Sequence, residues 1–122
     1  MCAVGEALHI QRFEGAAEGQ CVLRLVGPLT AATTSPLENV VRGEDADTLI
    51  IDLTQVPYVD SVGLGSLVGA YVSCQKAGKR IALSGANRRV VQLFEITKLD
   101  SFLLSFPSLD EAVEALTNSA TA

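Results

Sequence analysis

Residues 48–66 of this chain of 122 residues read TLIIDLTQVPYVDSVGLGS, and this stretch decides the fold. The apolar run at residues 48–53 predicts a central strand that is covered on both faces. A short loop holding Pro57 follows, and a helix is predicted from about residue 61 to residue 77, ending at Gly78. Glycines within a helix cost stability, roughly 1 kcal/mol each relative to alanine. We infer that something outside the helix needs close access to its first turns.

Hydrophobic periodicity and capping residues predict further elements on both sides of this stretch. Strands are predicted at residues 8–13, 20–26, 79–84 and 102–106. Helices are predicted to begin at Ser35, Asn87 and Ser108, and to end near residues 43, 98 and 116. At the first of them Pro36 suits the first helical position and Glu38 completes a capping box. Strands alternating with helices predict an α/β fold with a largely parallel or mixed sheet.

Length and composition limit the class of protein. The length predicts one compact domain over residues 1–122, with an ordered core of about residues 7–117. The formal net charge is −5 and the basic residues are scattered, which argues against direct binding to nucleic acid. The chain has 3 cysteines and no CxxC spacing, so we expect reduced thiols. It shows neither a signal peptide nor a membrane span, and we expect a soluble, cytoplasmic protein.

The predicted helix has one apolar face and one face of small, uncharged residues. The apolar stripe, predicted to pack on the sheet, comprises Leu64, Leu67, Val68, Tyr71 and Val72. The opposite face carries Val62, Gly65, Ser66, Gly69 and Ser73. An ordinary exposed helix face would carry charged side chains. We interpret this face as a docking platform for another macromolecule, while the alternative is that Gly65 and Gly69 permit close packing within the domain.

Catalysis, metal binding and cofactor binding find no support in the sequence. The single histidine, His9, lies in a predicted strand, and no nucleophile–base set or metal-ligand cluster is suggested. Asp52 ends the central strand as the phosphoacceptor of a receiver domain would, but the acidic pair and the lysine of that chemistry are missing. We expect Asp52 to order the following loop through local hydrogen bonds.

Ser61 stands at the predicted start of the central helix, next to Asp60. It is interpreted as a helix N-cap, as a phosphorylation site, or as both. A phosphate there would be favoured by the helix N-terminus, by roughly 0.3–1 kcal/mol, and opposed by Asp60. We therefore expect phosphorylation to leave the fold intact and to act on the binding of a partner.

Several short motifs, in the right order, resemble the STAS domain, and in particular the bacterial anti-sigma factor antagonists. The most specific of them is the Asp-Ser-x-Gly-Leu element at Asp60, which follows the Asp-Leu end of the central strand. The others are Gly27-x-Leu29 followed by Thr33, Ala77-Gly78-Lys79, and Ser108-Leu109-Asp110-Glu111-Ala112. The resemblance covers nearly the whole chain.

The resemblance implies a sheet of four to five strands with about four helices packed largely on one face. It implies a binding protein that is not an enzyme. In this family an ATP-dependent anti-sigma factor serine kinase phosphorylates the serine that matches Ser61. The unphosphorylated antagonist binds the kinase and releases the sigma factor, and a PP2C-type phosphatase resets the cycle. The partner-binding residues are then expected at Asp60, Ser61, Val62, Gly63, Gly65, Ser66, Gly69, Ser73 and Thr30.

Two positions depart from the family pattern. Thr30 stands where the family often has an acid, which affects partner choice if that acid contacts the kinase. Val62 stands where a second hydroxyl is common, which leaves Ser61 alone as phosphoacceptor at the helix tip.

Other functions remain open alongside the phosphorylation-controlled partner switch. One is a STAS accessory subunit of a phospholipid-transport ABC complex, in which the same helix would dock permanently on an ATPase. Another is a metabolic enzyme of similar fold, although no residue set supports it. A serine directly after Asp60 favours the partner switch.

Overall fold

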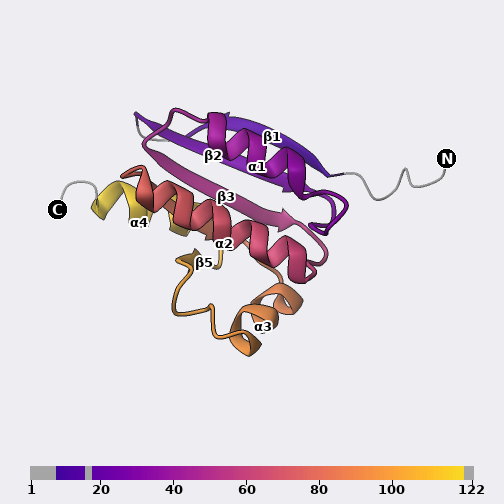
Figure 1. Cartoon of the computed structure of the whole chain (residues 1–122). Helices are drawn as coiled ribbons and strands as arrows, with labels where there is room; N and C mark the ends of the chain where they lie inside the picture. Colours follow the sequence, from indigo (N-terminus) through magenta and orange to yellow (C-terminus); the bar gives the residue numbers. More distant parts are fainter. Residues whose placement is uncertain (1–7, 16–17, 120–122) are drawn as a thin grey trace.

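The computed structural model describes residues 8–15 and 18–119, and its five strands form one sheet (Figure 1). The strands follow one another across the sheet in chain order. The first, β1 (His9–Glu14), is antiparallel to β2 (Gln20–Val26). Next come β3 (Thr48–Gln55), β4 (Arg80–Ser84) and β5 (Ser105–Phe106), each parallel to the strand before it. The predicted mixed α/β sheet is confirmed.

The four helices in the described part of the chain cover the two faces of the sheet unequally. Three of them, α1 (Thr34–Gly43), α2 (Ser61–Lys76) and α3 (Arg88–Ile96), contribute to the larger hydrophobic core on one face. The fourth, α4 (Leu109–Ser119), packs on the reverse face and is seen behind the sheet in Figure 1. Most of the helical layer therefore lies on one side, as the family resemblance implies.

The central strand β3 is buried on both faces because its side chains alternate between two cores. Leu49, Ile51 and Leu53 join the larger core beneath the three helices. Ile50 points the other way and packs with Ala112 and Leu116 of α4. An uninterrupted apolar run is the pattern of a strand covered on both sides. The prediction for this strand is confirmed.

The start of α1 differs from the prediction. The helix begins at Thr34 with Thr33 as its N-cap residue, so Ser35 already lies in the first turn, and the capping box predicted at Ser35 and Glu38 is wrong. The Thr33 hydroxyl accepts from the Thr30 N–H at 2.8 Å and donates to the Pro28 carbonyl at 3.0 Å. These bonds close the loop before the helix and set its first residue.

The end of the chain also differs in its boundaries. The strand predicted at residues 102–106 is reduced to the two residues of β5. The N–H groups of Phe102 and Leu103 both donate to the Leu99 carbonyl, which forms a turn and places the Phe102 ring 5.2 Å from that of Tyr71. Helix α4 extends to Ser119, beyond the predicted end at residue 116. Residues 7, 16 and 17 of the expected ordered core lie outside the described residues.

Two further features of the described chain bear on function. Cys21 and Cys74 are buried free thiols, and Cys2 lies outside the described residues. No helix in the described part of the chain combines the length and apolar character needed to span a bilayer.

Candidate functional site

Ser61 is the first residue of α2 and lies at the end of the sheet that is formed by the C-terminal ends of the parallel strands. Two loops meet there through backbone hydrogen bonds. The Leu29 N–H, after β2, donates to the Tyr58 carbonyl at 3.1 Å, and the Asp60 N–H donates to the Leu29 carbonyl at 3.1 Å. The start of α2 is therefore held by segments that are far apart in the sequence.

Asp60, and not Ser61, is the N-cap of α2. One carboxylate oxygen accepts from the Gly63 N–H at 2.8 Å, and the other accepts from the Ala31 N–H at 3.1 Å. The bond from Gly63 contributes most to holding the pKa of Asp60 below its ordinary value. The interpretation of Ser61 as the capping residue is wrong, because the preceding carboxylate takes that position.

The Ser61 side chain is left exposed by this arrangement. Its hydroxyl makes no hydrogen bond to any residue in the described ranges. A capping hydroxyl would be engaged with the backbone of the first turn. The hydroxyl of Ser61 is instead available to another molecule, at the positive end of the helix dipole and beside an ionised carboxylate.

Gly63 is required by the packing of the two loops. A Cβ at this position would collide with the backbone carbonyl of Leu29, the same group that accepts from Asp60. Gly63 is also buried. It was expected among the partner-binding residues, but the structure gives it a role inside the domain: it lets the loop after β2 approach the first turn of α2.

The outward face of α2 retains four of its five predicted small or apolar members. Val62 has half of its surface exposed, and Gly65, Gly69 and Ser73 are exposed. A Cβ at Gly65 or Gly69 would meet no atom within 4 Å. The alternative that these glycines serve packing within the domain is therefore wrong.

Ser66 does not belong to the exposed face, since only 7% of its surface is accessible. The buried side of α2 is rotated relative to the prediction, and Val68 and Val72 are only partly buried. Its members are Gly63, Leu64, Ser66, Leu67, Ala70, Tyr71 and Cys74. The reason is that α1 packs beside α2 on the same face of the sheet, which sequence periodicity cannot reveal (Figure 1).

Thr30 lies beside the same helix tip. Its N–H donates to the Thr33 hydroxyl, and its own hydroxyl accepts from the Ala32 N–H at 3.3 Å. The next residue, Ala31, donates to Asp60. The structure thus brings Thr30 to the same end of the sheet as Ser61, as a site shared between them requires.

The comparison with known families shows to which family the chain belongs. The family model described as "STAS domain" matches residues 9–112. The chain belongs to the STAS domain family.

Two curated relatives carry the same name. The anti-sigma-B factor antagonist of Listeria monocytogenes is 38% identical to this STAS protein over 74 residues, which is 61% of this chain and 65% of that one. The anti-sigma-B factor antagonist of Staphylococcus epidermidis is 31% identical over 84 residues, which is 66% of this chain and 78% of that one. The match to the Listeria protein thus spans less than two thirds of its length.

Solved structures share the fold of this STAS domain at lower identity. An anti-sigma factor antagonist from Mycobacterium paratuberculosis superposes with a TM-score of 0.78 at 23% identity, covering 88% of this chain and 92% of that one. A sulfate transporter family protein from Wolinella succinogenes superposes with a TM-score of 0.79 at 21% identity, covering 87% and 91%. The resemblance drawn from the sequence motifs is confirmed.

The start of the third helix of the STAS domain also supports the loop that leads into Ser61, a contact that the sequence did not predict. The Asn87 amide donates to the carbonyls of Val56 and Pro57 at 3.2 and 3.1 Å, while its oxygen caps α3 by accepting from the Val90 N–H. The Arg89 guanidinium lies 5.9 Å from the centre of the Tyr58 ring. Asn87 was identified only as a helix cap, because its second role depends on a loop about thirty residues away in the sequence.

Asp52 orders the end of β3, as predicted, and also joins three strands. Its carboxylate accepts from the Thr54 N–H at 3.1 Å, and from Arg24 of β2 at 3.0 Å and Ser84 of β4 at 3.4 Å. Burial favours the neutral acid, but the bonds from Thr54 and Arg24 outweigh it and keep the pKa of Asp52 low. The carboxylate thus has partners inside the fold, which explains its position without catalysis.

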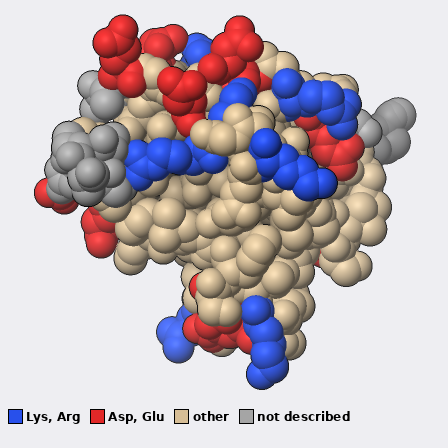
Figure 2. Space-filling view, turned by 60° about the vertical axis from the view of Figure 1, so that its left-hand side comes forward, with Lys and Arg blue, Asp and Glu red and all other residues tan. Residues whose placement is uncertain are grey.

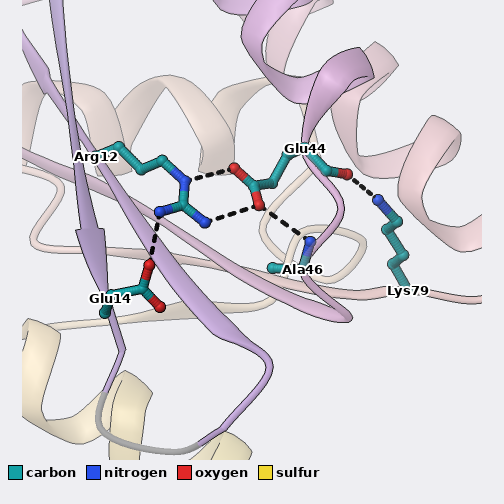
Figure 3. Close-up of polar contacts among 5 residues, drawn as sticks. All are labelled: Arg12, Glu14, Glu44, Ala46 and Lys79. Atoms are coloured by element: carbon teal, nitrogen blue, oxygen red, sulfur yellow. Dashed lines mark hydrogen bonds and ion pairs between the residues drawn. The ribbon is translucent and has the colours of Figure 1, made fainter.

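The opposite end of the sheet carries a tight cluster of charges (Figure 3). Arg12 donates from Nε to one oxygen of Glu44 at 2.8 Å and from a terminal nitrogen to the other at 3.1 Å. It also pairs with Glu14, and Lys79 bonds to the Glu44 carbonyl. The bond from Arg12 lowers the pKa of Glu44 to about 2. The cluster joins β1 to the end of α1, far from Ser61.

Charged side chains are unevenly spread over the molecule. In Figure 2 they gather at the top of the view, at the level of β1, β2 and α1, and again at the bottom on α3. Between these two groups, the centre of this face shows few acidic or basic side chains. Among the described residues, no group of three or more histidine, cysteine or carboxylate side chains is placed to hold a metal ion.

Proposed function

We propose that this protein is an anti-sigma factor antagonist that binds an anti-sigma factor kinase and is controlled by phosphorylation of Ser61. The observation that carries the proposal is the exposed, unengaged hydroxyl of Ser61 at the tip of α2, directly after a capping carboxylate. The names of the curated relatives support the same class of function. The proposal places the protein in the cytoplasm, where ATP and sigma factors are found.

The proposed switch acts on binding rather than on folding. The kinase transfers the terminal phosphoryl group of ATP to Ser61 Oγ; the bond between this group and ADP breaks, ADP leaves, and the hydroxyl proton is released. The phosphate adds about −1.5 to −2 charges next to the Asp60 carboxylate. The helix N-terminus offsets part of this repulsion in the free domain. Within an interface that lies against the uncharged face of α2, no such compensation exists, and burial of the added charge is costly.

The cycle then has two states. Unphosphorylated protein occupies the kinase, which frees the sigma factor from it. Phosphorylated protein leaves the kinase, and a PP2C-type phosphatase restores the hydroxyl by hydrolysing the phosphate ester. In this cycle the protein itself supplies only the binding surface and the phosphoacceptor.

Two substitutions at Ser61 test the proposal. We expect Ser61→Asp to weaken binding to the kinase by about tenfold or more, since each 1.4 kcal/mol of interface cost is one factor of ten. We expect Ser61→Ala to bind as tightly as the wild type and to accept no phosphate. Titration calorimetry measures the affinities, and phosphopeptide mapping after incubation with kinase and ATP locates the modification.

Two results would contradict the proposal. A phosphopeptide map with Ser61 unmodified and another residue phosphorylated would reject the assignment of the site. Stable co-purification with a transporter ATPase, unaffected by Ser61→Asp, would instead support the accessory subunit of a phospholipid-transport complex.

A further inference from the structure

A groove runs between α1 and α2 on the outer side of the helical layer. It has a volume of about 410 Å³. One wall is the outward face of α2, from Val62 to Ser73. The other wall is α1, where Glu38 and Arg42 are exposed. Buried residues line it between these walls: Val41, Ser66 and Ala70.

The glycines of this groove are not explained by the fold. Gly65 and Gly69 have ordinary helical backbone angles, and a Cβ at either would meet nothing within 4 Å. Alanine would therefore fit at both positions and would favour the helix. Gly65, Gly69 and Ser73 follow one another at intervals of four residues and all line the groove. Open space therefore runs along this side of α2.

The groove also holds a polar group without a partner. Ser66 lines the groove, and its hydroxyl oxygen is buried and forms no hydrogen bond with the residues described. A buried hydroxyl in a folded protein nearly always has a partner. An occupant that brings a polar atom to Ser66 would satisfy it, whereas a purely apolar occupant would leave it unpaired.

We infer that this groove receives an amphipathic helix of the partner that docks at Ser61, an inference that rests on the proposed function. Small residues spaced by four form a shallow path on which a second helix can approach closely, and a helix of three turns has the length of the path, about 16 Å. A strand would instead need an open sheet edge for its backbone bonds, and the groove offers only helix surfaces.

Charge selects the orientation of the incoming helix. Glu38 and Arg42 are one turn apart on α1, while the facing wall of α2 has no charge. The partner helix therefore carries a basic residue opposite Glu38 and an acidic residue opposite Arg42, on the side turned to α1. Its side turned to α2 carries small residues and one polar group within reach of Ser66. Val62 lies both in the groove and next to Ser61, so the two surfaces are continuous.

Photo-crosslinking in living cells that express the protein tests this inference. A benzophenone amino acid replaces either Val62 or Gly69, which line the groove. As a control, the same amino acid replaces Gln75, which is exposed on the same helix but lies outside the groove. We expect Val62 and Gly69 to crosslink to the same protein, with the peptide attached at Gly69 belonging to a helix, and Gln75 to give no such product. Mass spectrometry of the crosslinked peptides identifies them.

The outcomes separate the groove from the proposed function. A kinase captured at Val62 but not at Gly69, or an extended segment at Gly69, overturns the groove alone. A transporter ATPase captured at both positions through a helix supports the groove and overturns the proposed function. A second copy of this chain at Gly69 overturns the partner helix, since it makes the groove a self-association surface.

Affinity measurements with the captured protein give the second readout. Gly69→Leu fills the groove away from Ser61, and we expect it to weaken binding by about tenfold while phosphorylation is still confined to Ser61. Gln75→Leu, which places the same leucine side chain on α2 outside the groove, is expected to change affinity less than about twofold. Exchanging Glu38 and Arg42 is expected to weaken binding by several-fold. Unchanged affinity for both groove variants would overturn the inference.

Discussion

The glycines of α2 differ in what surrounds them. At Gly63 a Cβ would collide with the Leu29 carbonyl, which is itself hydrogen-bonded to Asp60. At Gly65 and Gly69, within the next two turns, a Cβ would meet no atom within 4 Å. The first glycine is needed by the fold. The other two are unexplained by anything inside the domain, so they point to a molecule outside it.

Two serines of the same helix also differ in what surrounds them. Ser61 is exposed and without a hydrogen bond, because Asp60 caps the helix in its place. Ser66 is buried beside α1. Identical residue types on one helix thus have different roles, and the neighbouring loop and helix decide between them.

The largest expected effect is at Gly63. We expect Gly63→Ala to lower the free energy of unfolding by about 1–3 kcal/mol, because the added methyl group displaces the loop after β2. Urea denaturation followed by circular dichroism measures the change. Gly65→Ala is the matched control, with the same chemical change in open space, and equal loss in both variants would contradict the comparison.

The next effect in size is at the helix cap. We expect Asp60→Ala to lower the free energy of unfolding by about 1–2 kcal/mol, because the N–H groups of Gly63 and Ala31 lose their acceptor. Asp60→Asn retains an acceptor and should cost less. Urea denaturation at neutral pH compares the two variants.

The cap also predicts a dependence on pH. The pKa of Asp60 is lowered in the folded state, so its stabilisation is complete above the ordinary value of 3.8 and is lost as the pH falls through the lower folded value. Asp60→Asn carries no titratable group, and its stability relative to wild type should therefore improve on acidification through this range. A constant difference between the two proteins from neutral pH downward would show that the carboxylate does not act as the cap.

The smallest expected effect has the opposite sign. We expect Gly65→Ala and Gly69→Ala each to raise the free energy of unfolding by up to about 1 kcal/mol, since alanine favours the helix and nothing obstructs it. Both should slightly weaken partner binding, because a methyl group enters the groove. Thermal denaturation and titration calorimetry measure the two effects, and a loss of stability would show that the open space is needed by the fold.

The elements with strong local signals could be predicted from the sequence. The buried run at residues 48–53, the glycine that ends α2 at residue 78, and the Asn87 cap of α3 were all located, because each depends on residues close to it in the chain. The start of α1 and the extent of β5 were misplaced. Both depend on turns that are closed by side chains or carbonyls, around Thr33 and Leu99.

The candidate site was predicted in outline but not in its division of roles. Sequence order placed a carboxylate and a hydroxyl at the tip of α2, and the motif resemblance indicated the family. It could not tell which of Asp60 and Ser61 caps the helix, since both residue types are good caps. The choice depends on Ala31, whose N–H also donates to Asp60 from a loop almost thirty residues earlier.

The sequence by itself determined the order of strands and helices, the central buried strand and the position of Ser61 at the start of α2, because periodicity and capping act over a few residues. Tertiary structure alone decided that Gly63 is internal while Gly65 and Gly69 face open space, and that Ser66 is buried beside α1. These distinctions depend on which remote segment packs against each side of α2. A helical pattern specifies which residues share a side, but the neighbours of that side are set only when the whole chain has folded.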